Sequence, residues 1–388
     1  MSISVRNFAF WSQLLVIVAG GFIPVACSDD SSRGQDLSVN PDRGQDRPVR
    51  EARGDAPSPD AASIDGQARD VLQADTQSPC FTLGGPQASS TGPKGKADIL
   101  FVIDNSSGMA PFQQALLGAI PTLEAALKSP ASTADFHIGV VTTDLGAGPY
   151  TLPNCHLCGD NGRLHQNPSL CPMGNLFMTN SYWGTMAENF QCLASAGEQG
   201  CGFEQPLESA AIFLTTQSIS AGFLRPDASL VIVVVTNEDD CSAKDRKLFD
   251  PSDTSLGLVD SFRCFQHGIT CNINDPTQPG PRTNCTPIVG GKLRDVSSYA
   301  SLFKSTKPAG RVGLVVLAGP PTPVSVSFAG SNADVNPSCK LALVVASAAP
   351  GIRLKALTDA FGSLGKFHSI CGSFSAAMTD VATMAHSL

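Results

Sequence analysis

The chain has 388 residues, with 26 basic and 34 acidic side chains and a formal net charge of −8 at neutral pH. It contains no basic block, which argues against a nucleic-acid-binding protein. Its thirteen cysteines would be unusual in a cytosolic enzyme of this length, because cytosolic thiols are kept reduced. Length, charge and cysteine content therefore favour an exported protein.

The first 26 residues are typical of a bacterial export signal. Arg6 is the only charged residue before Leu14–Ala26, an uncharged run too short to span a membrane comfortably. Small residues precede Cys27, as in a lipobox, so we predict a signal peptide over 1–26 and lipidation of Cys27. This places the protein in the cell envelope, at the outer membrane or facing the periplasm. Pro24 departs from the lipobox pattern, which leaves cleavage near Ala26 and an uncleaved anchor helix as alternatives.

A low-complexity segment follows the predicted signal. Residues 28–79 hold eleven acidic residues and six arginines but no Phe, Trp, Tyr or Lys. Such a composition buries too little apolar surface to offset the entropy of ordering. We therefore predict a disordered tether over 28–95, between the membrane and a folded domain over 96–388.

Short apolar runs alternate with helical patterns from residue 96 onward. Strands are predicted where apolar residues are continuous, and helices where they recur every three or four residues. The predicted strands are 99–103, 136–141, 230–235, 312–317 and 341–345, and the predicted helices are 111–128, 206–216, 353–361 and 374–386. This alternation predicts an α/β fold, with a doubly wound, mostly parallel sheet flanked by helices.

Two irregular stretches, 145–203 and 241–285, are rich in cysteine and are predicted to be loop insertions stapled by disulfides. Once Cys27 is assigned to a lipid, an even number of cysteines remains, which fits six disulfides. Zinc binding by Cys155, Cys158, His165 and Cys171 is the alternative use of one group. The twelve residues are Cys80, Cys155, Cys158, Cys171, Cys192, Cys201, Cys241, Cys264, Cys271, Cys285, Cys339 and Cys371.

Polar residues follow three of the predicted strands, in the segments 104–108, 142–144 and 236–240. Carboxyl ends of parallel strands share one edge of a sheet, where ligands commonly bind. Hydroxyl, carboxylate and amide oxygens are hard ligands suited to Mg²⁺, Mn²⁺ or Ca²⁺. The alternative is that these residues only form turns and helix N-caps.

The strand sequence that ends Phe101-Val-Ile-Asp-Asn-Ser106 resembles the first strand of von Willebrand factor A (vWA) domains. The phrases at 138–144, 202–207 and 235–241 resemble a bacterial lipoprotein branch of that family. The resemblance implies a vWA/Rossmann-like fold with a metal-ion-dependent adhesion site. In that site an Asp-x-Ser-x-Ser motif, a threonine and an aspartate hold a divalent cation, which binds an acidic group of a partner.

Only part of that motif is present. Asp104 and Ser106 match, but Gly108 replaces the second serine, with Ser107 displaced by one position. No threonine lies near 200–204, where Glu204 is the nearest oxygen donor. Asn237 stands where the family's aspartate is expected, and Asp239 is the aspartate two residues on. The implied metal ligands are Asp104, Ser106, Ser107, Asn237 and Asp239, with Asp144 and Glu204 as additional candidates.

The sequence thus favours a membrane-anchored binding or adhesion module that uses a divalent cation to engage a protein partner. The alternative is a structural or envelope-interaction protein that keeps the fold without the metal. A cryptic hydrolase is the third hypothesis, although Ser106 lacks the flanking glycines of a nucleophile elbow and no histidine lies near it in sequence. We therefore expect no enzymatic activity.

Overall fold

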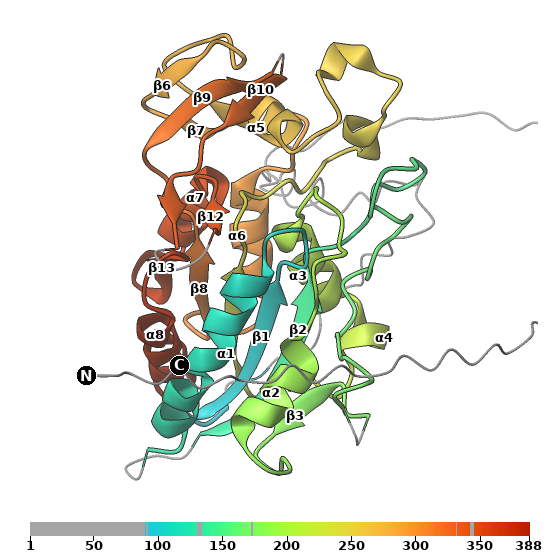
Figure 1. The fold of residues 1–388 in the computed structure, drawn as a ribbon. Coiled ribbons are helices and arrows are strands. Elements are labelled where there is room, and N and C mark those ends of the chain that lie inside the picture. Colours follow the sequence, from blue (N-terminus) through green and yellow to red (C-terminus); the bar gives the residue numbers. More distant parts are fainter. Residues whose placement is uncertain (1–89, 91, 130–133, 172–173, 331, 342–344) are drawn as a thin grey trace, which may run out of the picture. The chain divides into compact units, whose positions relative to one another are not determined.

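The computed structural model describes residues 90, 92–129, 134–171, 174–330, 332–341 and 345–388 (Figure 1). The predicted signal peptide, Cys27, Cys80 and nearly all of the predicted tether lie outside these residues. None of the helices among the described residues is both long and apolar enough to span a membrane.

A six-stranded sheet forms the centre of the described part, in the order β13-β8-β4-β1-β2-β3. All neighbouring strands are parallel except β3, which pairs antiparallel with β2 at one edge. Every residue of β4 is buried, as its run of Leu, Val and Ile predicts for a central parallel strand. The strands are β1 Lys96–Ile103, β2 Asp135–Thr142, β3 Phe177–Thr179, β4 Ser229–Val235, β8 Val312–Ala318 and β13 Gly365–Ser369.

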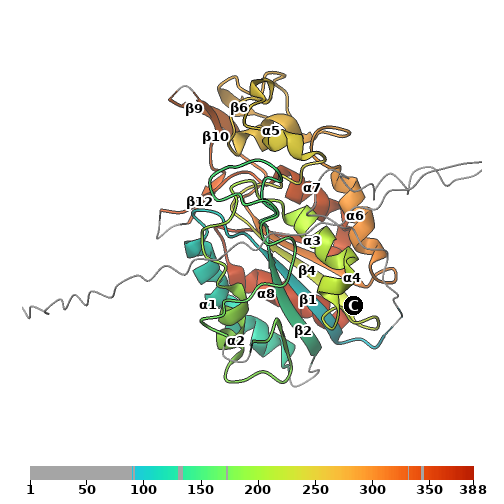
Figure 2. The same ribbon diagram turned by 90° about the vertical axis from the view of Figure 1, so that its right-hand side faces the viewer.

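Helices cover both faces of this sheet (Figure 2). Side chains alternate along β1, so that Phe101 packs in the core with α1, α2 and α8 while Leu100 packs in the core with α3, α6 and α7. The helices are α1 Ala110–Leu127, α2 Met186–Ala194, α3 Pro206–Thr215, α4 Gln217–Ser220, α5 Phe262–Gly268, α6 Val296–Ser305, α7 Ile352–Ala360 and α8 Phe374–Ser387.

The predicted α/β class is confirmed: the fold is mixed α/β with a mostly parallel central sheet, compatible with a Rossmann-like fold. The strand predicted at 341–345 is wrong at the two residues of this range that the structure describes. Leu341 and Val345 lie in no strand, and Val345 is fully exposed. The outer strand is β13 instead. Its sequence, Gly-Lys-Phe-His-Ser, lacks an apolar run because it lies at the sheet edge and is only half-buried.

Smaller elements lie above the main sheet in both views (Figures 1 and 2). A three-stranded antiparallel sheet has the order β10-β9-β6, and two further strand pairs are short. The strands are β5 Ile269–Thr270, β6 Gly280–Arg282, β7 Thr286–Pro287, β9 Val324–Ala329, β10 Asn332–Val335, β11 Cys339–Lys340 and β12 Ser347–Ala348, and the 3₁₀ turns are η2 Arg246–Phe249, η3 Thr254–Leu256 and η4 Gly362–Leu364.

Disulfides staple these loops, as the cysteine content predicts. Cys155, Cys158 and Cys171, the three cysteines weighed as zinc ligands, are all disulfide-bonded. Several disulfides in one domain indicate an oxidising compartment outside the cytoplasm. The five pairs among the described residues are Cys155–Cys201, Cys171–Cys192, Cys241–Cys264, Cys271–Cys285 and Cys339–Cys371.

Candidate functional site

Asp104 joins the ends of β1 and β4 and is completely buried. Its backbone N–H donates to the carbonyl of Val235 at 2.9 Å, continuing the pairing of the two strands. One carboxylate oxygen accepts the N–H of Ser106 at 2.7 Å, and the other accepts the hydroxyl of Thr236, also at 2.7 Å. The Asp104 side chain is therefore fixed between the two strand ends.

The loop after Asp104 explains why the motif departs from Asp-x-Ser-x-Ser. Ser106 is buried, and its side chain hydrogen-bonds both Asp104 and Glu204. Ser107 is exposed. Gly108 has a φ of +90°, a left-handed conformation that a serine would adopt only with strain. The loop conformation accounts for a glycine at the second serine position.

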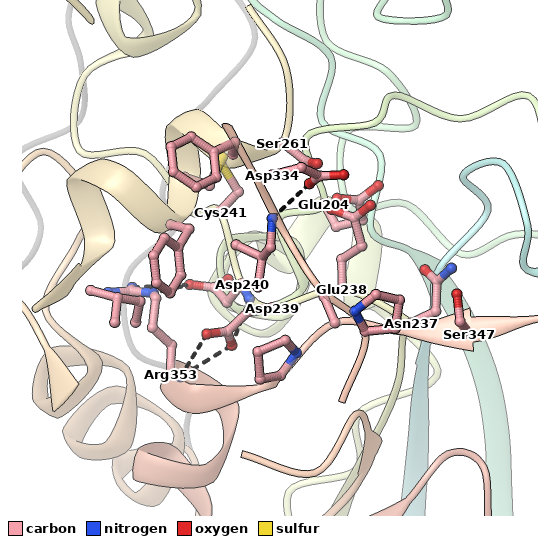
Figure 3. Close-up of a pocket in the computed structure, with 18 residues that line it drawn as sticks. Glu204, Asn237, Glu238, Asp239, Asp240, Cys241, Ser261, Asp334, Ser347 and Arg353 are labelled. Carbon is pink, nitrogen blue, oxygen red and sulfur yellow. Dashed lines mark hydrogen bonds and ion pairs between the residues drawn. A yellow bond between two sulfur atoms is a disulfide. The ribbon is translucent and has the colours of Figure 1, made fainter. Parts of the chain in front are cut away.

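Glu204 and Glu238 extend the network from Asp104 toward the surface. Glu204 is 1% exposed, and its carboxyl group hydrogen-bonds that of Glu238, which also contacts the hydroxyl of Ser261. Figure 3 shows the carboxyl groups of Glu204 and Glu238 side by side, with Ser261 and Asp334 next to them. We call Asp104, Ser106, Glu204 and Glu238 the acidic cluster.

Burial and mutual repulsion raise the pKa values in the acidic cluster. Burial raises the pKa of Asp104, and burial together with the charges of Glu238 and Asp104 raises the pKa of Glu204 well above its usual value. Burial, followed by the charge of Asp104, raises the pKa of Glu238 to about 7. A basic side chain is not among the main influences on any of these three carboxyl groups.

Other buried carboxylates of the same domain are paired with cations. Asp98 lies 2.7 Å from Arg225, Asp240 lies 3.0 Å from Arg353, and Glu208 lies 3.1 Å from Arg294. Unpaired buried charge is costly, so proteins normally pair it or use it to coordinate a metal. The acidic cluster lacks such a pair, and it brings several carboxyl groups together.

A pocket of about 250 Å³ opens from the acidic cluster toward α5 and β10 (Figure 3). One wall is polar and contains Glu204, Asn237, Glu238, Ser261 and Asp334. The pocket also has an apolar wall, to which Phe262, Phe265, Ile269 and Pro350 contribute. The Cys241–Cys264 disulfide attaches α5 beside the end of β4 and so fixes the apolar wall against the polar one.

Asn237 and Asp239, both predicted ligands, have different surroundings. Asn237 lines the pocket, is 9% exposed, and its side-chain oxygen has no hydrogen-bond partner among the described residues. Asp239 also borders the pocket, but its carboxylate accepts the backbone N–H groups of residues 352–354 at the start of α7, the shortest at 2.9 Å. Burial nevertheless raises its pKa to about 6. Asp239 therefore caps a helix.

Asp144 lies in a second group of polar residues after β2. Its carboxylate accepts the N–H of Gly146 at 2.8 Å, and burial, with the charge of Asp160 as a further contribution, raises its pKa to about 6. Asp160 accepts the hydroxyl of Thr142 at 2.5 Å. A side chain at Gly159 would lie 2.3 Å from the Asp144 carboxylate. Asp144 thus organises the first disulfide-rich loop.

The oxygen chemistry of the acidic cluster fits a divalent cation. Oε1 of Glu204 is buried without a hydrogen-bond partner among the described residues, as is Oδ1 of Asn237. No three His, Cys, Asp or Glu side chains within the described ranges are placed to hold a metal ion together. A cation here would therefore need the hydroxyl of Ser106 and the amide of Asn237 beside the carboxylates, and hard cations accept both.

Three residues of the site were missed from the sequence. Glu238 carries a local signal, because it lies in the polar run after β4, but the family motif has an aspartate in this run and so points to Asp239. Ser261 and Asp334 carried no such signal, because the pocket brings them in from α5 and β10. No known protein-family model matches the chain, and no curated protein is significantly similar to it.

Proposed function

We propose that this protein is an exported binding module that holds a divalent cation in the acidic cluster and uses the adjoining pocket to engage a protein partner. The observation that carries the proposal is the burial of Asp104 and Glu204 beside the partly buried Glu238, without a basic side chain among the main influences on these carboxyl groups. A bound cation would supply the missing positive charge.

Two of the carboxylates of the acidic cluster would hold the ion, together with the hydroxyl of Ser106 and the unpartnered amide oxygen of Asn237. These are hard oxygen ligands, which favour Mg²⁺, Mn²⁺ or Ca²⁺ over softer metals. When bound, the ion would offset part of the negative charge of the carboxylates, and water would fill its remaining coordination positions. Thr236 fixes the Asp104 carboxylate and Ser261 fixes that of Glu238, so the chain itself orients both groups.

Membership of the vWA family is part of this proposal. The order of strands and helices and the Asp104–Ser106 match support it. Glu204 stands near the position where the family has a threonine, so a carboxylate would replace a neutral hydroxyl ligand. In this scheme Ser107 and Asp239 are not ligands, because Ser107 is exposed and Asp239 caps α7.

The proposed location is the bacterial cell envelope, with the domain attached to a membrane through a lipid on Cys27. The disulfides support a compartment outside the cytoplasm. The outer membrane and the periplasmic face both agree with this placement.

A metal-independent interaction protein is the second candidate function. Two observations favour it: Gly108 replaces a ligand of the family motif at a left-handed backbone position, and no three-residue His, Cys, Asp or Glu group suited to a metal is found among the described residues. Under this alternative the raised pKa values leave part of the cluster protonated, and partner capture survives EDTA.

Thermal unfolding of the full-length, disulfide-intact protein separates the two candidates. Mg²⁺, Mn²⁺ or Ca²⁺ at about a hundred times the dissociation constant should stabilise the fold by about 2.7 kcal/mol, which raises Tm by roughly 5–10 °C. Glu204→Gln should abolish the rise.

Glu198→Gln is the matched control. Glu198 lies in the same loop and accepts the N–H groups of Gly108 and Ala110, which a glutamine oxygen can also accept. Its variant should keep the full metal response. If none of the three ions shifts Tm of the unmodified protein, the metal-dependent function is wrong and the metal-independent one stands.

A further inference from the structure

The negative charge of the acidic cluster continues to the mouth of the pocket. Asp334, on β10, lines the pocket and is exposed, and its charge acts on both Glu238 and Asp260. Asp260 is half-buried next to Ser261, with one carboxylate oxygen unpartnered among the described residues. Asp334 therefore places a carboxylate at the mouth, in addition to the proposed metal ligands, and the charge of Asp260 lies near it.

Little positive charge offsets this acidity. Arg353 is the basic side chain among the described residues that line the pocket, and its guanidinium pairs with Asp240 at 3.0 Å. A single divalent ion would leave Asp104, Glu204, Glu238 and Asp334 with a net negative charge. A carboxylate that approached the pocket would be repelled, whereas a cation would be attracted.

The apolar wall adds a second requirement for the partner group. Phe262 and Phe265 have ring centroids 5.7 Å apart and border the pocket together with Ile269. The volume of about 250 Å³ is just below the ~300 Å³ at which pockets for whole small molecules begin. It suits one extended side chain with an apolar stem, which long basic residues provide.

We propose that the group which enters this pocket is a primary ammonium on an alkyl chain. Its stem would lie along Phe262 and Phe265, and its three N–H donors would face Glu238, Asp334 and the hydroxyl of Ser261. The inference rests on the proposal that this pocket is the binding site, but it reverses the acidic partner that the vWA resemblance implies. A lysine side chain of a partner protein and a free alkylamine share this chemistry.

Calorimetric titration of the full-length protein with small probes tests the inference. The probes are Nα-acetyl-lysine methylamide, its uncharged norleucine analogue, the corresponding glutamate derivative, and 1,5-diaminopentane. The lysine probe should bind at least about tenfold more tightly than the norleucine and glutamate probes, since about 1.4 kcal/mol corresponds to a factor of ten. If the lysine probe binds more tightly than 1,5-diaminopentane, the natural ligand is a lysine side chain of a protein. If the diamine binds more tightly, the natural ligand is a free amine.

Asp334→Asn is the informative variant, because Asp334 is exposed and its replacement leaves the packing of the domain unchanged. This variant should bind the lysine probe about fivefold or more weakly, and its metal-induced rise in Tm should be unchanged. Asp275→Asn, at an exposed acid of the second insertion outside the pocket, should change neither. Equal or tighter binding of the glutamate probe, or an Asp334→Asn variant that binds lysine normally, would overturn the inference. A failed metal response with normal lysine binding would instead count against the metal-dependent function alone.

Discussion

Glu238→Gln is the perturbation for which the structure gives the clearest magnitude. Burial and the charge of Asp104 raise the pKa of Glu238 from 4.5 to about 7. One pH unit between the folded and unfolded pKa values is worth about 1.4 kcal/mol. The difference of about 2.5 pH units therefore lowers the stability of the folded state by roughly 2–3 kcal/mol, allowing for the partial exposure of the side chain.

The sign follows from proton binding. Below pH 4.5 Glu238 is protonated in both states and has no effect on stability. Between pH 4.5 and about 7 the folded state holds a proton that the unfolded state has released, so the free energy of unfolding falls as pH rises. Above pH 7 the full penalty remains. Glu238→Gln should remove this decline, so that in EDTA the variant is more stable than the unmodified protein by about 2–3 kcal/mol at pH 8 and equal to it near pH 4.

Urea unfolding in EDTA at pH 4, 6 and 8, with the disulfides intact, measures the difference. Glu208→Gln provides a matched comparison, because Glu208 is a buried glutamate that Arg294 and Tyr299 contact at 3.1 and 2.5 Å. The same substitution there removes the anion of a paired Arg294 and should destabilise the protein by about 2 kcal/mol. If Glu238→Gln also destabilises at pH 8, or if its stability declines with pH as steeply as the unmodified protein, the unpaired-charge argument is refuted.

Two further predictions concern residues of the expected motif. Gly108→Ser should not strengthen cation binding in a titration and should lower stability to urea by about 1 kcal/mol, because a φ of +90° strains any residue with a Cβ. Asp239→Asn should lower stability by about 1 kcal/mol or more, because a neutral amide replaces the carboxylate that caps α7, while the metal-induced rise in Tm persists. A loss of the metal response in Asp239→Asn would restore Asp239 as a ligand.

Most of the main sheet was predictable because its strands are buried on both faces and read as continuous apolar runs. β4 is the clearest case, with all seven residues buried. β13 was missed because an edge strand needs no such run, and α2 was missed because its helix lies inside a cysteine-rich stretch. Local composition therefore located the interior of the sheet better than its edges.

The site was predictable only where its residues directly follow a strand. Asp104 and Ser106 follow β1, so their position at the sheet edge was expected. The different roles of Glu238 and Asp239 could not be predicted, because they depend on α7. The first residue of α7 comes 113 positions after Asp239, and its backbone N–H binds the Asp239 carboxylate. Ser261 and Asp334 reach the pocket through the insertions, whose paths the sequence does not reveal.

Glu204, near the position where the vWA motif has a threonine, affects both metal binding and the charge of the partner that the pocket can accept. A hydroxyl there leaves a bound divalent ion with positive charge to offer an acidic partner, whereas Glu204 adds a negative charge beside Glu238 and Asp104. With Asp334 at the mouth, the same electrostatics that would favour a cation within the cluster would disfavour a carboxylate outside it. Metal affinity and partner charge are therefore coupled in this proposal, since each carboxylate that strengthens the hold on the ion also makes the pocket more selective for a basic group.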